Sequence, residues 1–203
     1  MAPGRLDARS LDIETPSGPA QVSLSRRGKQ GLYVVGHGAG GGIDAVDIVA
    51  VSRALVGLGW TVARVVQPYR VKGRRAPEPP PRLDAAWTAV LDALRRERSG
   101  RLVVSGRSSG ARVAVRTAAA VGADAVVALA FPLHPPGRPE KSRADELLGL
   151  RVPSLVVQGE RDAFGTPAEL PPGTNVVAVP GDHSLKQAPD LVAAAVVQWL
   201  GAG

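Results

Sequence analysis

Short runs of β-branched and aliphatic residues recur along this chain, and segments with helical spacing separate them. Strands that alternate with helices indicate a parallel sheet, because each crossover returns the chain to the same edge. We therefore expect an α/β fold in which helices cover both faces of a mostly parallel central sheet. The predicted strands span residues 32–35, 62–66, 102–104, 126–129, 155–157 and 175–179.

The beginning of the chain departs from this alternation. Residues 10–15 and 20–25 are typical of β-strands, and Pro16-Ser17-Gly18 between them favours a turn, which together predict an N-terminal antiparallel hairpin. Two later segments carry apolar residues at the spacing of one helix face. These stripes are Leu83, Trp87, Val90, Leu91 and Leu94 in one segment and Leu191, Ala195, Val196 and Trp199 in the last.

Composition limits the class of protein. A chain of 203 residues, 44% of them apolar, suits a single domain over residues 1–203. The absence of cysteine excludes disulfides, a thiolate nucleophile and cysteine-bound zinc. No stretch has the apolar length of a membrane span, and residues 1–14 lack the apolar region of a secretory signal. We expect a cytoplasmic protein with no membrane partner.

The formal net charge of +7 raises the question of nucleic-acid binding. Basic residues are nevertheless spread along the chain, and the one dense run, residues 70–75, adjoins the prolines of residues 77–81 without interleaved aromatic residues. We interpret this run as a solvated loop and predict no nucleic-acid partner. A preference for anionic substrates stays open, and nothing in the sequence indicates the oligomeric state.

Residues suited to chemistry directly follow four of the predicted strands. A glycine-rich stretch occupies residues 36–42, and Gly106-Arg107-Ser108-Ser109-Gly110 follows the third strand. Residues 158–162 and 181–183 follow two later strands and supply acidic residues and a histidine. Because ligands bind at the carboxyl ends of parallel strands, we expect these four loops to meet at one edge of the sheet.

Residues 106–110 have the GxSxG form of a nucleophile elbow between a strand and a helix. In such a turn the serine lies at the tip of a sharp, strained bend, and the flanking glycines remove Cβ atoms that would collide. A serine, an acid and a histidine then follow in the order Ser108, Asp162 and His183, which is the order found in α/β-hydrolases.

On these motifs the chain resembles the α/β-hydrolase superfamily, and more narrowly its small dienelactone-hydrolase-like branch, which also contains the KANL3/Tex30-type domains. The resemblance implies the α/β-hydrolase fold and a Ser-His-Asp triad, and it leaves the substrate open. Ser109 departs from the pattern, because many relatives carry methionine or glycine there; that position contributes its backbone N–H, so the change need not impair catalysis. The matching segments are residues 36–42, 67–69, 106–112, 131–140, 158–167 and 181–186.

The predicted triad consists of Ser108, His183 and Asp162. Ser108 would attack an acyl carbon, and His183 would take its proton and return it to the leaving group. Asp162 matches the acid position of the family and would orient the imidazole; Glu160 and Asp182 are the alternatives, one nearer the strand and the other next to the histidine.

The remaining predicted site residues surround the triad. The backbone N–H groups of Ala39 and Ser109 are the predicted oxyanion-hole donors, since glycines around Ala39 allow close approach to a substrate. His37 has the alternative role of holding the oxyanion loop, Tyr69 that of a half-exposed packing residue, and His134 that of a solvated loop residue. The predicted substrate-binding residues are His37, Gly38, Tyr69, Arg107 and His134.

Two other interpretations compete with a hydrolase. Residues 36–41 also satisfy the GxGxxG fingerprint, but the second parallel strand ends without an acidic residue for NAD, so only an NADP site using Arg64 or Arg70 would fit. The second is a hydrolase-fold scaffold that binds a partner without turnover. We predict no cofactor, because the acidic partner for the ribose is missing. We also predict no metal, because no two histidines have metal-ligand spacing on one element.

The connection between the predicted strands at 126–129 and 155–157 is too short for a large helical cap. We therefore expect an open site that takes a small acyl ester, lactone or thioester as its substrate.

Overall fold

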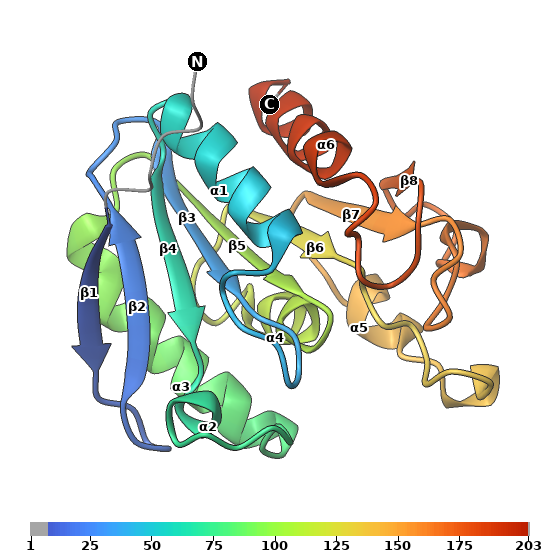
Figure 1. The fold of residues 1–203 in the computed structure, drawn as a ribbon, viewed down its shortest axis with the longest axis horizontal. Helices are drawn as coiled ribbons and strands as arrows, with labels where there is room; N and C mark the ends of the chain where they lie inside the picture. The colour runs from blue at the N-terminus through green and yellow to red at the C-terminus, as the bar shows by residue number, and fades with distance from the viewer. Residues whose placement is uncertain (1–7, 203) are drawn as a thin grey trace.

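The computed structural model describes residues 8–202 (Figure 1). Residues 1–7 and 203 lie outside the described residues, and so does the first half of the segment for which the sequence predicts no secretory signal. Among residues 8–202 no helix has the length and apolar character needed to cross a membrane. The strands are β1 (Ala8–Ile13), β2 (Ala20–Ser25), β3 (Gly31–Gly36), β4 (Thr61–Val66), β5 (Arg101–Arg107), β6 (Ala125–Leu129), β7 (Ser154–Gly159) and β8 (Val176–Val179).

All of these strands join one 8-stranded sheet in the order β1-β2-β4-β3-β5-β6-β7-β8. The predicted hairpin is present, with β1 antiparallel to β2 and Ile13 opposite Ala20, although β1 begins and ends two residues earlier than the pattern suggests. β2 is antiparallel to β4, and every remaining pair is parallel. The predicted α/β class with a mostly parallel sheet is confirmed.

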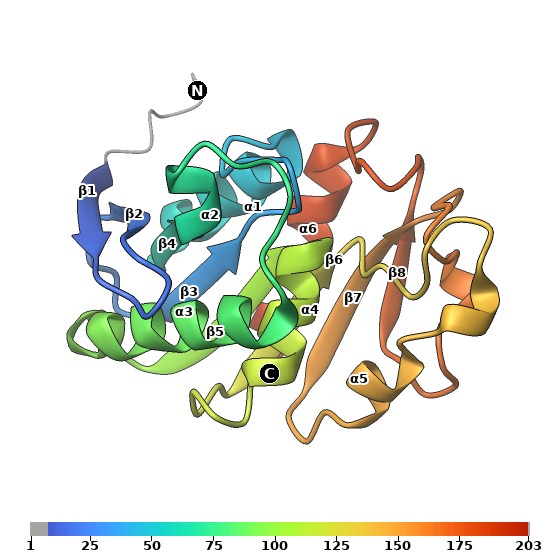
Figure 2. The ribbon, with the colours of Figure 1, turned by 90° about the horizontal axis from the view of Figure 1, so that it is seen from below.

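Helices cover both faces of the sheet, as Figure 2 shows. Side chains alternate along each strand, so Val34 faces one layer while Tyr33 and Val35 face the other. Val34 shares its core with α3 and α4, and the opposite face packs on α1 and α6. The helices are α1 (Val46–Gly57), α2 (Pro68–Val71), α3 (Pro80–Ala93), α4 (Ser109–Thr117), α5 (Ala144–Leu148) and α6 (Pro189–Gly201), with 3-10 turns η1 (Leu94–Glu97), η2 (Pro139–Lys141) and η3 (Pro167–Glu169).

The two predicted helical stripes have different outcomes. The first is confirmed, since its members from Leu83 to Leu94 are all buried. The second is confirmed only in part: Val196 is buried and Ala195 and Trp199 are half-buried, but Leu191 is 53% exposed. The other buried residues of α6 are Val192, Ala193 and Leu200. Because α6 is apolar around most of its circumference, periodicity alone does not fix which face turns inward. Leu191, Ala195 and Trp199 instead line a hollow beside β8.

The connection from β6 to β7 holds only η2 and the short helix α5. No large cap is present in the described residues, so the carboxyl ends of the parallel strands stay uncovered there. This edge carries the loops that contain the predicted site.

Candidate active site

The turn from β5 to α4 has the geometry of a nucleophile elbow. Ser108 has φ 53° and ψ −115°, a backbone conformation that residues other than glycine rarely adopt. A Cβ at Gly106 would lie 2.1 Å from the backbone carbon of Gly110, and one at Gly110 would lie 2.7 Å from the His37 carbonyl oxygen. Both glycines are therefore sterically required. The Ser108 N–H donates to the Leu129 carbonyl at 2.9 Å, which fixes the turn to β6.

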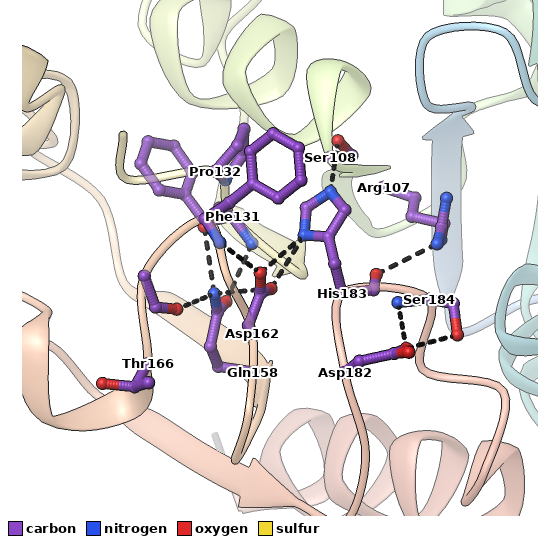
Figure 3. A network of polar contacts seen from close by, with 12 residues as sticks. Arg107, Ser108, Phe131, Pro132, Gln158, Asp162, Thr166, Asp182, His183 and Ser184 are labelled. Carbon is purple, nitrogen blue, oxygen red and sulfur yellow. Dashed lines mark hydrogen bonds and ion pairs between the residues drawn. The ribbon is translucent and has the colours of Figure 1, made fainter. Parts of the chain in front are cut away.

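Three polar side chains from separate loops meet at this turn (Figure 3). His183, in the loop between β8 and α6, places Nε2 2.8 Å from Ser108 Oγ. Its Nδ1 lies 2.8 Å and 3.0 Å from the two carboxylate oxygens of Asp162, whose side chain is fully buried. With the proton on Nδ1, His183 donates to Asp162 and accepts from the Ser108 hydroxyl. That tautomer leaves Nε2 free to act as a base.

The Asp162 carboxylate is held by a second set of donors. Gln158 is fully buried in β7, and its amide nitrogen donates to Asp162 Oδ2 at 3.0 Å. The same nitrogen also donates to the carbonyl of Gly165 at 2.7 Å, and Phe131 N–H donates to the Gln158 side-chain oxygen at 2.9 Å. The backbone N–H of Phe164 donates to Asp162 Oδ1 at 2.8 Å. These bonds point one carboxylate edge at His183.

Sequence reasoning did not single out Gln158 or Phe164, although both lie in the segment that resembles the family. The Phe164 ring stacks on the His183 imidazole, with centroids 4.1 Å apart and an interplanar angle of 29°. A glutamine at the end of a buried strand was an available signal, because a buried amide must find partners for both its oxygen and its nitrogen.

Neither alternative acid reaches the imidazole. Asp182 accepts hydrogen bonds from the backbone N–H and the hydroxyl of Ser184, at 2.8 Å and 2.5 Å, and these bonds lower the pKa of its exposed carboxyl. Glu160 is exposed, and its carboxylate accepts no hydrogen bond from residues 8–202. The geometry therefore favours Asp162 as the partner of His183.

The glycine-rich loop after β3 lies directly against the elbow. A Cβ at Gly38 would lie 3.3 Å from Ser108 Cβ, so any other residue there would require a shift of the elbow or the loop by a few tenths of an ångström. In the described chain, neither the Ala39 N–H nor the Ser109 N–H donates to another protein group. Both amides are consequently available to an incoming oxygen.

His37 braces this loop from inside. Its Nδ1 is 2.8 Å from the Gly38 carbonyl, and its Nε2 accepts the Gln67 N–H at 3.1 Å. This pattern requires the neutral ring with the proton on Nδ1, and burial lowers the pKa of His37 accordingly. Arg70 adds a further brace, because its Nε donates to the Gly41 carbonyl at 2.9 Å. Within the run that the sequence predicts to be a solvated loop, Arg70 thus supports the glycine-rich loop, while residues 72–75 are exposed as expected.

The other predicted substrate-binding residues have partners within the protein, and Tyr69 also lines a small cavity together with His37 and Ser109. Tyr69 is 2% exposed and packs against the His37 ring at 5.8 Å, and burial raises its pKa. His134 is 6% exposed; its Nδ1 faces the Pro135 carbonyl at 2.9 Å and its Nε2 faces Glu169 at 3.2 Å. Arg107 turns its guanidinium to Asp47 and to the His183 carbonyl. Among residues 8–202 no three His, Asp or Glu side chains are grouped to hold a metal ion.

The chain is similar to known proteins in both sequence and fold. The sequence profile of the alpha/beta hydrolase domain matches residues 29–190. A lidless α/β serine hydrolase from Xanthomonas campestris shares 24% identity over 98% of both chains, with a TM-score of 0.72. A Pyrococcus furiosus esterase shares 16% identity over 97% of this chain and 90% of its own, with a TM-score of 0.77. No curated protein matches the chain.

A third similar structure is Est1E from Butyrivibrio proteoclasticus with bound ferulic acid, which has 18% identity, covers 95% of this chain and 98% of its own, and has a TM-score of 0.76. Structural likeness at such low identity establishes a shared fold. The profile match adds family membership, because it spans well over half of the sequence and includes Ser108, Asp162 and His183. The chain belongs to the alpha/beta hydrolase domain family.

Proposed function

We propose that this protein is a serine hydrolase that cleaves a small acyl ester, lactone or thioester through Ser108, His183 and Asp162. One observation carries the proposal: an unbroken hydrogen-bond relay runs from Ser108 Oγ through the imidazole of His183 to a buried carboxylate. This relay is the arrangement that makes a serine hydroxyl nucleophilic. The branch of the family that the sequence resembles, the dienelactone-hydrolase-like one, is part of the same proposal.

The reaction follows from the positions of these groups. Ser108 Oγ attacks the acyl carbon while its proton moves to His183 Nε2, and the carbonyl π electrons move to the oxygen. When the tetrahedral intermediate collapses, the bond to the leaving group breaks and His183 Nε2–H protonates that group. Water then attacks the acyl carbon and gives a proton to His183 Nε2. The bond to Ser108 Oγ breaks, Oγ takes that proton, and the carboxylic acid leaves. Asp162 stabilises the imidazolium formed in each half.

The oxyanion would be bound by the backbone amides of Ala39 and Ser109. Support comes from the close approach of the loop to the elbow, since a Cβ at Gly38 would lie 3.3 Å from Ser108 Cβ, and from the absence of a protein acceptor for either amide in the described chain. A donor of this kind typically contributes about 3 to 4 kcal/mol to transition-state stabilisation. His37 and Arg70 keep the loop that carries Ala39 in place through the carbonyls of Gly38 and Gly41.

Substrate size is argued from the uncovered edge of the sheet. With only η2 and α5 between β6 and β7, the described residues provide no cap to enclose a long acyl chain. A small acyl group needs little enclosure, because most of its binding energy comes from the oxyanion hole and the immediate walls. Proteins of similar fold include a Pyrococcus furiosus esterase and Est1E with bound ferulic acid, which supports acyl chemistry as the proposal.

Fluorophosphonate labelling followed by peptide mass spectrometry tests the proposal. We expect a single adduct on Ser108 and none on Ser105 or Ser109, since Ser105 is fully buried and bonded to Tyr33. Ser108→Ala should lose the adduct and about 10⁶-fold in kcat on the best ester or thioester of a panel, as loss of the nucleophile does in subtilisin. Ser109→Ala should retain both.

Labelling that persists undiminished in Ser108→Ala would remove Ser108 from its role. A wild-type protein that neither labels nor turns over any substrate of the panel would instead favour the scaffold alternative. The dinucleotide alternative loses its structural basis, because the glycine stretch lies against Ser108 and α1 begins only at Val46. A dinucleotide fingerprint needs the helix to start directly at the glycines.

A further inference from the structure

Arg107 joins segments that are far apart in the sequence. Its Nη2 donates to the backbone carbonyl of His183 at 3.0 Å (Figure 3). Its Nε lies 3.2 Å from Asp47 Oδ2. A Cβ at Gly38 would lie 3.3 Å from Arg107 Nη1, so the guanidinium also underlies the oxyanion loop. One side chain on the residue before the nucleophile therefore touches the loops that carry the base and the oxyanion donors.

The partner of Arg107 is an acid that other considerations do not explain. Asp47 lies in the first turn of α1 and is fully buried. Burial raises the pKa of its carboxyl, and the charge of Arg107 opposes that effect. Neither carboxylate oxygen of Asp47, nor Arg107 Nε, has a hydrogen bond of ordinary geometry within residues 8–202. The charge of Arg107 is therefore the main compensation, with smaller contributions from the backbone N–H groups of Asp47 and Ile48. A buried acid with so few partners lowers the stability of the fold. Its presence therefore points to a role other than stability.

We propose that Asp47 and Arg107 form a positioning pair that fixes the backbone of His183 over the nucleophile. Asp47 anchors the guanidinium at Nε, which leaves Nη2 aimed at the His183 carbonyl. The inference rests on the proposed function, because it assigns these two residues a part in presenting the general base. It also gives Arg107 a role that replaces direct binding of substrate.

The loop that carries His183 needs such a fixed point. His183 lies between β8 and α6, and Asp162 holds only the imidazole end of the residue. A ring held at one end can still swing about its own backbone, which would move Nε2 away from Ser108. The bond from Arg107 to the carbonyl supplies the second fixed point, and the buried side chain of Leu185 closes the turn that follows.

Arg107→Gln alone is an ambiguous test, because it leaves Asp47 buried without a partner. We expect that variant to lower Tm by roughly 10 °C as well as to slow labelling. The double variant Asp47→Asn/Arg107→Gln removes both charges and should recover most of the lost Tm. Its fluorophosphonate labelling should nevertheless stay about 100-fold slower than that of the wild type, the effect of a displacement of about 1 Å.

Arg107→Lys separates charge from geometry. Its ammonium retains the ion pair with Asp47, but a single nitrogen cannot also reach the His183 carbonyl in the manner of the fork-shaped guanidinium. We expect near-normal Tm and labelling as slow as in the double variant. Arg112→Gln is the matched control: Arg112 pairs with Glu146 on the outer side of α4, so its loss should leave the labelling rate unchanged.

A second readout does not depend on hydrolysis. The Nδ1–H between His183 and Asp162 should give a low-field proton resonance, which we expect in the wild type and in Arg112→Gln and expect to be broadened or lost in Asp47→Asn/Arg107→Gln. A stable double variant with wild-type labelling and a wild-type resonance would overturn the positioning role, and so would wild-type labelling in Arg107→Lys. If the wild type itself fails to label, the proposed function fails, and the resonance alone decides the inference.

Discussion

The elbow that carries Ser108 and the loop that carries His183 are positioned by different means. The elbow is set by backbone packing: Gly106 and Gly110 have no room for a Cβ, and the Ser108 N–H is bonded to β6. The His183 loop is held next to β7 by a backbone bond from the Arg161 N–H to the Gly181 carbonyl at 2.9 Å. His183 itself, however, is held by side chains from elsewhere, with Asp162 and Phe164 at the ring and Arg107 at the carbonyl. Ser108 is therefore placed by main-chain contacts, and the His183 ring is placed by side-chain contacts.

This difference determines how each loop should respond to mutation. A Cβ added at the elbow collides with main chain, which cannot move away without deforming β5 or α4. A side chain removed from the His183 loop leaves the fold in place and changes only how often the imidazole is aligned. Substitutions at the elbow should thus lower stability and activity together, whereas those around His183 should lower activity first.

The largest effect on the base side is expected for Asp162→Asn. An amide at this position offers an N–H where His183 needs an acceptor, so the imidazole takes the wrong tautomer. We expect kcat to fall about 10⁴-fold on whichever ester the panel identifies, while far-UV circular dichroism stays that of the wild type.

Glu160→Gln and Asp182→Asn are the controls, because neither carboxylate contacts His183. Each should keep kcat within a few-fold of wild type. If Asp162→Asn turned over normally and Glu160→Gln were nearly inactive, the acid would move by two residues and the rest of the mechanism would stand.

Gly106→Ala probes the elbow. The new methyl would lie 2.1 Å from the Gly110 backbone, so strand or helix must shift. We expect the free energy of unfolding to fall by about 3 kcal/mol or more, measured by urea denaturation, together with loss of labelling.

Gly57→Ala is the matched control at the end of α1, where an added methyl meets nothing within 4 Å. It should be neutral or stabilise the protein by up to about 1 kcal/mol. A Gly106→Ala protein that is as stable as Gly57→Ala and labels normally would show that the elbow is more plastic than its packing indicates.

Gln158→Leu tests the support behind the acid. The substitution removes a donor to Asp162 and leaves the buried Phe131 N–H without its acceptor, which costs about 1 to 3 kcal/mol of stability. Because Phe164 N–H still holds the other carboxylate oxygen, the displacement of Asp162 should be small and kcat should fall only roughly tenfold. A decrease as large as that of Asp162→Asn would place Gln158 on a level with the acid itself.

The same contrast explains what the sequence could predict. The elbow was predictable because Gly106, Ser108 and Gly110 lie within five residues of one another. The GxSxG spacing itself indicates a sharp turn in which the glycines must lack a Cβ. The parallel sheet was predictable from alternating strands and helices, and the meeting of the four loops followed from its topology. Asp162 could be preferred over Glu160 and Asp182 only through the family resemblance.

The remaining features depend on contacts that no local pattern encodes. The pairing of Arg107 with Asp47 joins residues that only the fold brings together. The sequence does not indicate which way the side chain of Arg107 points. Tyr69 and His134 both follow strand ends, and their nearly complete burial is set by packing that no local pattern indicates. The buried face of α6 was predicted only in part for a related reason. A helix that is apolar on most sides has no unique inner face in its sequence, and packing against neighbouring elements determines that face.

The smallest effect is expected at the Phe164 ring, which sharpens the comparison because the backbone and side chain of this residue act separately. Its N–H bonds Asp162 and survives substitution, whereas its ring stacks on His183 and does not. A stacked aromatic pair contributes about 0.5 to 1.5 kcal/mol, so Phe164→Ala should lower kcat/KM by no more than about tenfold. Phe164→Tyr keeps the stack and should retain most of the rate. A loss above about 100-fold in Phe164→Ala would mean that the ring, and not the bond from Arg107, is the main constraint on the base.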